Sequence, residues 1–234
     1  MIDEYPEILP AIDPQQALER IGGGYETEVY RTADHKYVIK SKGEVHGSVQ
    51  QAVARAQQMR ASAEQFAAYL GEEYSIPSYF VIVGPSAAHA QELVIQPYIK
   101  HAQPLSTLDY GALDTEDRVR IIAQLWEIKQ RARACYRATR TMPDLDGLWS
   151  SSRAERARLR AAYMFVWHLW GMLITRTLLR SNNLLLTKDP QRRVVLVDYD
   201  LVQAPWFLRR LYFAVRKLLF YRDAILLLRF RGKA

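Results

Sequence analysis

The 234-residue chain contains a single cysteine, Cys135. One thiol excludes an internal disulfide and a cysteine-based metal cluster. The first six residues are acidic and interrupted by a proline, so they do not have the character of a secretory signal. The longest uncharged stretch between two arginines, 161–175, has 15 residues, whereas a membrane span needs about 20. We interpret that stretch as a buried helix and expect a cytoplasmic protein.

Acidic residues are almost absent from the end of the chain. Residues 201–234 contain one acid, Asp223, and eight lysines and arginines, which together account for the whole net charge of +7. Apolar residues recur there at helical spacing, and the stripe consists of Leu208, Leu211, Tyr212, Val215, Leu218 and Leu219. The pattern predicts a cationic amphipathic helix.

Three interpretations of this tail are open. We favour one in which the apolar stripe packs against the C-terminal half of the protein and the arginines are solvated. A second places the helix on an anionic membrane surface, which would make the protein peripheral at the inner membrane face. A nucleic-acid surface is the third and least favoured, because no recognition motif accompanies the charge.

What the chain does contain is an ample apolar core, with 49% apolar and 24% charged residues, as in globular proteins of one domain or two small lobes. Periodicity predicts mainly strands before residue 100 and helices after it. The predicted helices are 14–20, 45–70, 115–139 and 153–175, and the predicted strands are 25–31, 36–40, 79–83 and 92–99. Pro97 should end the pairing of the last of these strands.

A run of three glycines, Gly22, Gly23 and Gly24, precedes the first predicted hairpin. A dinucleotide-binding fingerprint requires a strand, glycines and then a helix, and the predicted order is different. Backbone N–H groups can approach phosphate oxygens where no Cβ intervenes. The spacing from Gly22 to Val29, followed by Lys40 on the next strand, fits the glycine-rich loop of kinases, with a threonine in place of the third glycine. A plain flexible turn is the alternative.

A second hairpin is predicted from two short apolar runs, 184–186 and 194–197, around the polar turn 187–193. Asn183 leads into the first run and Asp198 ends the second. A hairpin can bring these two positions together, and an amide oxygen beside a carboxylate suits Mg²⁺. An ordinary hairpin with polar ends is the alternative interpretation.

These residues, in this order, resemble the protein-kinase-like superfamily over about 21–202. The resemblance is closest to small bacterial members such as aminoglycoside and lipopolysaccharide kinases. It implies an α+β bilobal fold. Residues 1–99 would form a nucleotide-binding lobe with a sheet and one long helix, and 100–234 a mostly helical lobe that carries the metal-binding hairpin and the basic tail. It also implies ATP and Mg²⁺ as cofactors.

The same resemblance assigns roles to individual residues. Lys40 would bind the phosphates and Glu64 would orient Lys40, with Glu72 and Glu73 as weaker rivals. The three glycines and Val29 would cover the nucleotide. A hinge at Gln96 and Tyr98 would receive the adenine edge through its backbone, and Asn183 and Asp198 would hold Mg²⁺.

One departure from the family pattern concerns catalysis. The position that holds the catalytic-loop aspartate, five residues before Asn183, is Leu178. Either the protein is a pseudokinase, an inactive nucleotide-binding or protein-interaction module, or another acid orients the acceptor; the candidates are Asp144, Asp146 and Asp200. Positioning and charge neutralisation dominate phosphoryl transfer, so the loss of the base need not abolish it. The acceptor, whether small molecule, lipid or protein, is not indicated.

Overall fold

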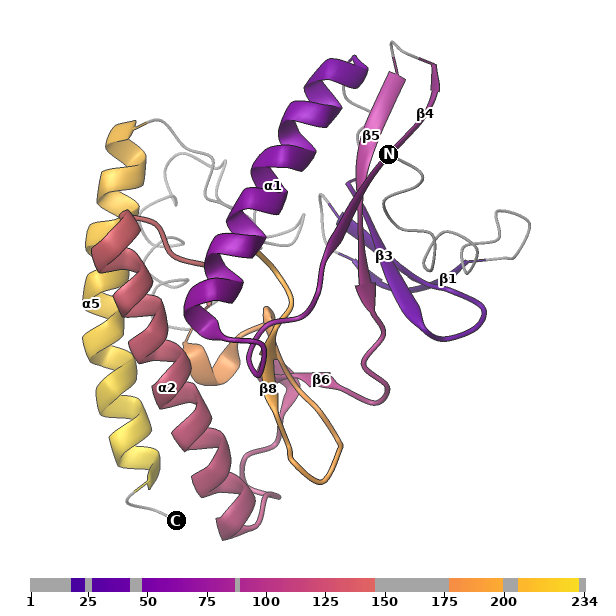
Figure 1. Ribbon diagram of the computed structural model, residues 1–234. Coiled ribbons are helices and arrows are strands. Elements are labelled where there is room, and N and C mark those ends of the chain that lie inside the picture. Colours follow the sequence, from indigo (N-terminus) through magenta and orange to yellow (C-terminus); the bar gives the residue numbers. More distant parts are fainter. Residues whose placement is uncertain are drawn as a thin grey trace, which may run out of the picture. The chain divides into compact units, whose positions relative to one another are not determined.

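The computed structural model describes residues 18–23, 27–42, 48–86, 89–145, 177–199 and 206–231. The described part of the chain forms two compact units and belongs to the α+β class, as predicted (Figure 1). One unit contains the described residues up to Ala61 and Pro77–Ile99, and the other contains Ser62–Ile76 and the described residues from Lys100 onward. The chain therefore passes between the units three times.

The first unit is built on an antiparallel sheet of five strands in the order β1-β2-β3-β5-β4 (Figure 1). Helix α1, Val49–Leu70, connects β3 to β4. It starts four residues after the first residue of the predicted helix, 45–70. The strands are β1 (Glu19–Gly23), β2 (Thr27–Arg31), β3 (Tyr37–Lys42), β4 (Tyr79–Ser86) and β5 (His89–Pro97). As predicted, β5 ends at Pro97, which has no N–H to donate to a further pair.

The predicted helix over residues 14–20 is wrong at its described end. Glu19 and Arg20 lie in β1 and pair with Arg31 and Tyr30 of β2. A neighbouring strand therefore overrides the weak local helical pattern, since pairing satisfies the backbone groups of both strands. Gly22 and Gly23 consequently lie at the end of β1 and pair with Val29 and Glu28 of β2; Gly24 lies outside the described residues.

Helix α1 ends at Leu70, as predicted, and a glycine follows it. Gly71 follows the last helical residue with φ +82°, and its N–H donates to the carbonyl of Ala67 at 2.8 Å. A left-handed residue at this position is the usual helix C-terminal cap and favours glycine. A Cβ at this position would also collide with the side chains of Glu73 and Arg131.

The second unit is built on two long helices, α2 (Thr115–Thr139) and α5 (Trp206–Arg231). Helix α2 has the predicted bounds, because Asp114 caps it by accepting the N–H of Asp117 at 2.7 Å. The guanidinium of Arg118 lies 5.5 Å from the Phe230 ring, and the ammonium of Lys129 lies 5.8 Å from the Phe220 ring. The two helices are therefore antiparallel neighbours (Figure 1).

A small antiparallel sheet completes this unit in the order β6-β7-β8. Its strands are β6 (Gln103–Pro104), β7 (Leu184–Leu186) and β8 (Val194–Leu196), and two short 3-10 helices, η3 (Leu105–Thr107) and η5 (Leu178–Arg180), flank them. The strands β7 and β8 form the hairpin that was predicted from sequence. The predicted helix of residues 153–175, Asp146 and Asp200 lie outside the described residues. No described helix combines the length and the apolar character needed to cross a membrane.

Candidate functional site

In the first unit, one face of the sheet gathers the predicted nucleotide-binding positions. Val29 of β2 and Val94 of β5 both lie directly opposite Lys40 of β3, and directly opposed residues point to the same face. Val38 lies two residues before Lys40 and opposite Gln96, which places Gln96 on that face as well. The intervening Ile39 is buried and belongs to the opposite face. The strand register therefore brings these predicted positions to one surface of one unit.

The segment that follows β5 is tied to the β2–β3 hairpin. The N–H of Tyr98 donates to the carbonyl of Lys36 at 2.7 Å, and the guanidinium of Arg31 lies 5.3 Å from the centre of the Tyr98 ring. Gln96 is buried, and its Nε2 donates to Oγ of Ser78 at 2.8 Å. Hydrogen bonds within the first unit therefore hold the backbone of Tyr98 and the side chain of Gln96, the two residues of the predicted hinge.

Packing does not explain the glycine at position 22. A Cβ there would meet no atom within 4 Å, and the residue is exposed. A larger side chain would therefore fit as far as the protein itself is concerned. The pairing of β1 with β2 is irregular between Arg20 and Gly22, and glycine is common at such an irregularity in a strand.

Glu64, the predicted partner of Lys40, is exposed on α1 in the part that belongs to the second unit. Of its rivals, Glu73 forms an ion pair with Arg131 at 2.7 Å. Sequence reasoning overlooked Glu92, which is buried on the Lys40 face of the sheet and pairs with Arg55 of α1 at 3.2 Å. The sequence contains a sign of this pair, because Glu92 directly precedes the apolar residues 93–95 of the predicted strand, and a buried charge in such a strand needs a partner.

In the second unit, the β7–β8 hairpin brings the two predicted metal ligands close together. Leu184 lies opposite Leu196, and the next pair continues through a hydrogen bond of 3.0 Å from the N–H of Val197 to the carbonyl of Asn183. Asp198 follows Val197 directly. The backbones of Asn183 and Asp198 therefore lie at adjacent strand ends; that their side chains hold Mg²⁺ stays a prediction.

The orientation of the Asn183 amide is fixed by its partner. Its nitrogen Nδ2 donates to the backbone carbonyl of Asp144 at 2.8 Å. A carbonyl oxygen only accepts hydrogen bonds, so the NH₂ group must face it and Oδ1 must point the other way. Asn183 is buried. Such an amide offers a hard oxygen in a defined direction, which fits a magnesium ligand.

The same contact brings one candidate acid next to Asn183. Asp144 is buried, and its backbone carbonyl accepts the bond from Asn183, while the carbonyl of the next residue, Leu145, is also bonded to the loop before β7. Besides the Asn183 bond, Oγ of Ser181 donates to the carbonyl of Leu145 and accepts the N–H of Asn183 at 3.0 Å. Of the three acids proposed to replace the catalytic-loop aspartate, Asp144 is the one that the structure describes and places beside Asn183.

Leu178 is part of the core. It starts the 3-10 helix η5 and is buried. The following residues are held by the segment after β6, where Oη of Tyr110 donates to the carbonyl of Leu179 at 2.7 Å and the N–H of Ser106 donates to the carbonyl of Ser181 at 3.0 Å. The leucine therefore has a packing role.

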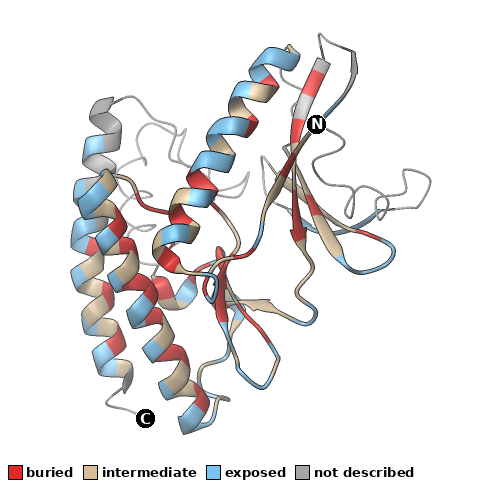
Figure 2. Ribbon diagram, viewed as in Figure 1, coloured by how far each residue is buried: buried red, intermediate tan, exposed pale blue. Residues whose placement is uncertain are grey.

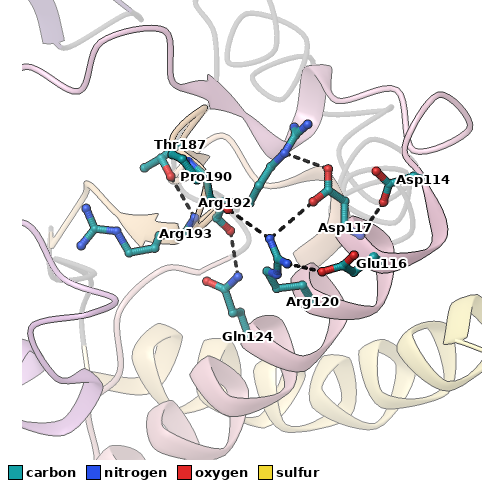
Figure 3. A network of polar contacts seen from close by, with 9 residues as sticks. All are labelled: Asp114, Glu116, Asp117, Arg120, Gln124, Thr187, Pro190, Arg192 and Arg193. Atoms are coloured by element: carbon teal, nitrogen blue, oxygen red, sulfur yellow. Dashed lines mark hydrogen bonds and ion pairs between the residues drawn. The ribbon is translucent and has the colours of Figure 1, made fainter.

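A network of polar contacts anchors the far end of the hairpin to α2 (Figure 3). Gln124 holds the end of the turn and the start of β8, because Nε2 donates to the carbonyl of Arg192 and Oε1 accepts the N–H of Val194, each at 2.8 Å. Asp117 pairs with Arg192 at 2.8 Å, and Arg120 donates to the carbonyl of Pro190 at 3.2 Å. The helix thereby sets the position of the hairpin that carries Asn183 and Asp198.

We expect Gln124→Ala to loosen this hairpin. The variant leaves the carbonyl of Arg192 and the N–H of Val194 without their partner, which should cost about 1–3 kcal/mol. Amide hydrogen exchange at Val194 should accelerate by roughly ten- to a hundredfold. Gln191→Ala, an exposed glutamine in the same turn, is the control. Unchanged exchange at Val194 in the Gln124 variant would show that the hydrogen bonds of Gln124 do not stabilise the hairpin.

Tyr199, which follows Asp198, is buried and bonded to a distant backbone. Its Oη accepts the N–H of Ile76 at 2.6 Å and donates to the carbonyl of Ile76 at 3.1 Å. Burial raises the pKa of the Tyr199 phenol to about 12, and the charge of Asp198 acts in the same direction. The structure therefore favours the neutral phenol.

This shift predicts a specific loss of stability in alkali. The pKa of Tyr199 is higher in the folded protein than in the unfolded chain, where it is about 10. Its contribution is therefore complete below about pH 10 and disappears between about pH 10 and 12. Unfolding free energies measured from pH 8 to 11.5 should fall less steeply for Tyr199→Phe than for the unmodified protein. Tyr221→Phe, at an exposed position, should leave the slope unchanged.

Within the described ranges, no group of three or more histidine, cysteine, aspartate or glutamate side chains is arranged to hold a metal ion. The predicted pair of Asn183 and Asp198 is of another type, an amide with one carboxylate. No protein-family model matches the chain, and none of the curated proteins matches it. Any assignment of function must therefore start from the residues just described.

Proposed function

We propose that this chain has a kinase-like bilobal fold and binds ATP together with Mg²⁺. Support comes from the order of its elements. A five-stranded antiparallel sheet with one long helix between its third and fourth strands is followed by a mostly helical unit with a β-hairpin. Both parts correspond to what the sequence resemblance implies for a nucleotide-binding lobe and a metal-binding lobe.

The observation that carries the proposal is the pair of adjacent strand ends at Asn183 and Asp198. The backbone carbonyl of Asp144 directs the Asn183 amide oxygen away from itself, so the donor set consists of two hard oxygens. In the proposal, Asn183 and Asp198 hold Mg²⁺, which when bound neutralises phosphate charge. Lys40 binds the phosphates, and Gly22 and Val29 cover the nucleotide.

The reaction we propose is transfer of the γ-phosphoryl group to an acceptor. Such transfer depends mainly on positioning and on charge neutralisation. Asp144 is the acid we assign to orienting the acceptor, because its backbone is bonded to Asn183. Its burial excludes bulk water from its surroundings, and this would strengthen its electrostatic effect.

The alternative is a pseudokinase that binds nucleotide without transferring phosphate. The buried Leu178 favours it, since the position that carries the catalytic aspartate in kinases serves packing here. In this case the protein would act as an interaction module. Both alternatives share nucleotide binding and differ in the chemical step.

Two measurements separate these alternatives. The melting temperature, measured with ATP alone and with ATP and Mg²⁺, tests binding; a shift that requires Mg²⁺ supports the metal assignment, and no shift under either condition rejects both alternatives. Hydrolysis or transfer of γ-labelled phosphate then distinguishes a kinase from a pseudokinase. Asp144→Asn should keep the thermal shift and lose the transfer, whereas transfer that survives in this variant would remove Asp144 from its proposed role.

A further inference from the structure

Helix α5 has two apolar faces. Leu219 and Leu227 are buried and lie eight residues apart, on the face that packs in the second unit beside α2. A second set of large apolar side chains points to solvent. Its members are Leu218, Tyr221, Ile225 and Leu228, with exposed fractions of 68%, 55%, 52% and 58%.

We refer to these four residues as the outer stripe. Their spacing of three, four and three residues places them along one side of the helix. Figure 2 shows exposed segments alternating with buried ones along α5. The predicted stripe that would pack inward is therefore wrong at Leu218, because the helix turns Leu219 inward and leaves its neighbour in solvent.

The outer stripe is the one place, among the described residues, where four large exposed apolar side chains follow one another on a single element. The other exposed large apolar residues are spread over β1, α1, β4 and α2 and the residue before β1. Single exposed apolar residues are ordinary on protein surfaces, whereas contiguous ones mark interaction sites. A partner for this face is therefore expected.

The charges on α5 indicate the kind of partner. The helix contains seven lysines and arginines and one acid, Asp223. That acid is buried and pairs with Arg222 at 2.7 Å, so its charge does not reach the outer face. Arg210, Lys217 and Arg229 are exposed. The outward side of α5 is consequently apolar along its middle and cationic around it.

A second copy of the chain is a poor match for this face. The spacing of the outer stripe would suit a coiled coil, but pairing then depends on opposite charges beside the apolar seam. The positions that flank the stripe are Lys217, Arg222, Ala224 and Arg229, and none is acidic. Two such helices would repel one another, and like charges across an interface oppose association.

Nucleic acid matches only half of the surface. Lysines and arginines can neutralise phosphates, but the outer stripe would then remain in water. A lipid surface with anionic headgroups uses both features, because apolar side chains enter the acyl boundary while cations remain at the headgroups.

We propose that α5 docks this protein on an anionic lipid bilayer through the outer stripe and its flanking cations. The helix lies in the plane of the interface. Its buried face, with Leu219 and Leu227, stays packed in the second unit, so docking requires no unfolding. This inference is independent of the proposed nucleotide site and stands even if that proposal fails.

Co-sedimentation of the full chain with lipid vesicles tests the inference. We expect binding to vesicles of phosphatidylcholine and phosphatidylglycerol in a 7:3 ratio, and little or none to pure phosphatidylcholine. Binding should weaken as salt is raised, because surface charges are screened. A chain that stays in the supernatant with the anionic vesicles at low salt would overturn the proposal.

Two variants separate the apolar and the cationic contributions. The double variant Leu218→Ser and Ile225→Ser should lower vesicle binding by about tenfold or more, and Lys217→Glu with Arg229→Glu should do the same or exceed it. Both pairs are at exposed positions, so folding should be unaffected. The matched controls are Val119→Ser on α2 and Lys188→Glu in the hairpin turn, which are also exposed and should bind as the unmodified protein does.

Other outcomes would assign the face differently. Vesicle binding that persists after the serine substitutions would show that the outer stripe is not the docking surface. Dimerisation in sedimentation velocity that Ile225→Ser abolishes would identify a second copy as the occupant and reject the lipid. Binding to single- or double-stranded nucleic acid without binding to vesicles would likewise overturn the proposal.

Discussion

Replacing Lys40 or Asp198 by alanine should abolish the rise in melting temperature that Mg²⁺ and ATP produce together. A ligand present at about a hundred times its Kd stabilises a protein by about 2.7 kcal/mol, which for a chain of this size corresponds to roughly 5–10 °C. Loss of the phosphate-binding ammonium or of the metal-binding carboxylate removes a charged contact to the triphosphate. We therefore expect less than about 1 °C of the shift to remain in either variant.

The controls use the same residue types nearby. Lys36→Ala changes an exposed lysine beside the start of β3, and Asp189→Ala changes an aspartate in the turn at the other end of the β7–β8 hairpin. Both should keep the full shift. A full shift in the Lys40 variant would reject the kinase-like assignment, and a full shift in the Asp198 variant would reject the metal site.

The largest loss of stability is expected for Leu196→Ala. Leu196 in β8 is completely buried, and its N–H donates to the carbonyl of Tyr74 at 2.8 Å. Truncation of a buried leucine costs about 2–5 kcal/mol through lost transfer energy and the remaining cavity, which corresponds to roughly 4–20 °C in melting temperature. All five tryptophans lie between residues 126 and 206, so unfolding followed by tryptophan fluorescence reports on the second unit.

Leu185→Ala is the matched control on the neighbouring strand. Leu185 in β7 is half-buried and lies opposite Val195. The same truncation there removes fewer contacts, so the loss should be clearly smaller than for Leu196. Equal losses at the two positions would mean that the hairpin does not form the core of this unit, and the placement of Asn183 and Asp198 would need another explanation.

Local patterns in the sequence predicted several elements well. Asp114 is a strong cap, and α2 starts at the residue after it. The apolar runs on both sides of the 187–193 turn formed the hairpin, because each run has a buried side and turn residues at its ends. These elements could be predicted because the residues that determine them lie within or directly beside them in the sequence.

Other features could not be predicted from local patterns, because they depend on residues that are distant in sequence. The strand at Glu19–Gly23 depends on β2, which pairs with it. The contact between Asn183 and Asp144 joins residues 39 positions apart, and the split of α5 into an inner and an outer face depends on α2. The hydrophobic pattern showed that α5 is amphipathic but did not show which of Leu218 and Leu219 would be covered.

The second unit is formed from two separate parts of the chain, because the segment 62–76 belongs to it. Although this segment lies between two parts of the first unit, its backbone completes the second: the carbonyl of Tyr74 accepts from Leu196, and both polar groups of Ile76 bond to Tyr199. An expressed fragment beginning at residue 100 would leave Leu196 and Tyr199 without these acceptors and donors. A single cut in the chain therefore cannot separate the two units into halves that fold independently. A fragment with the C-terminal half needs residues 62–76 as well, either added as a peptide or joined to it by circular permutation.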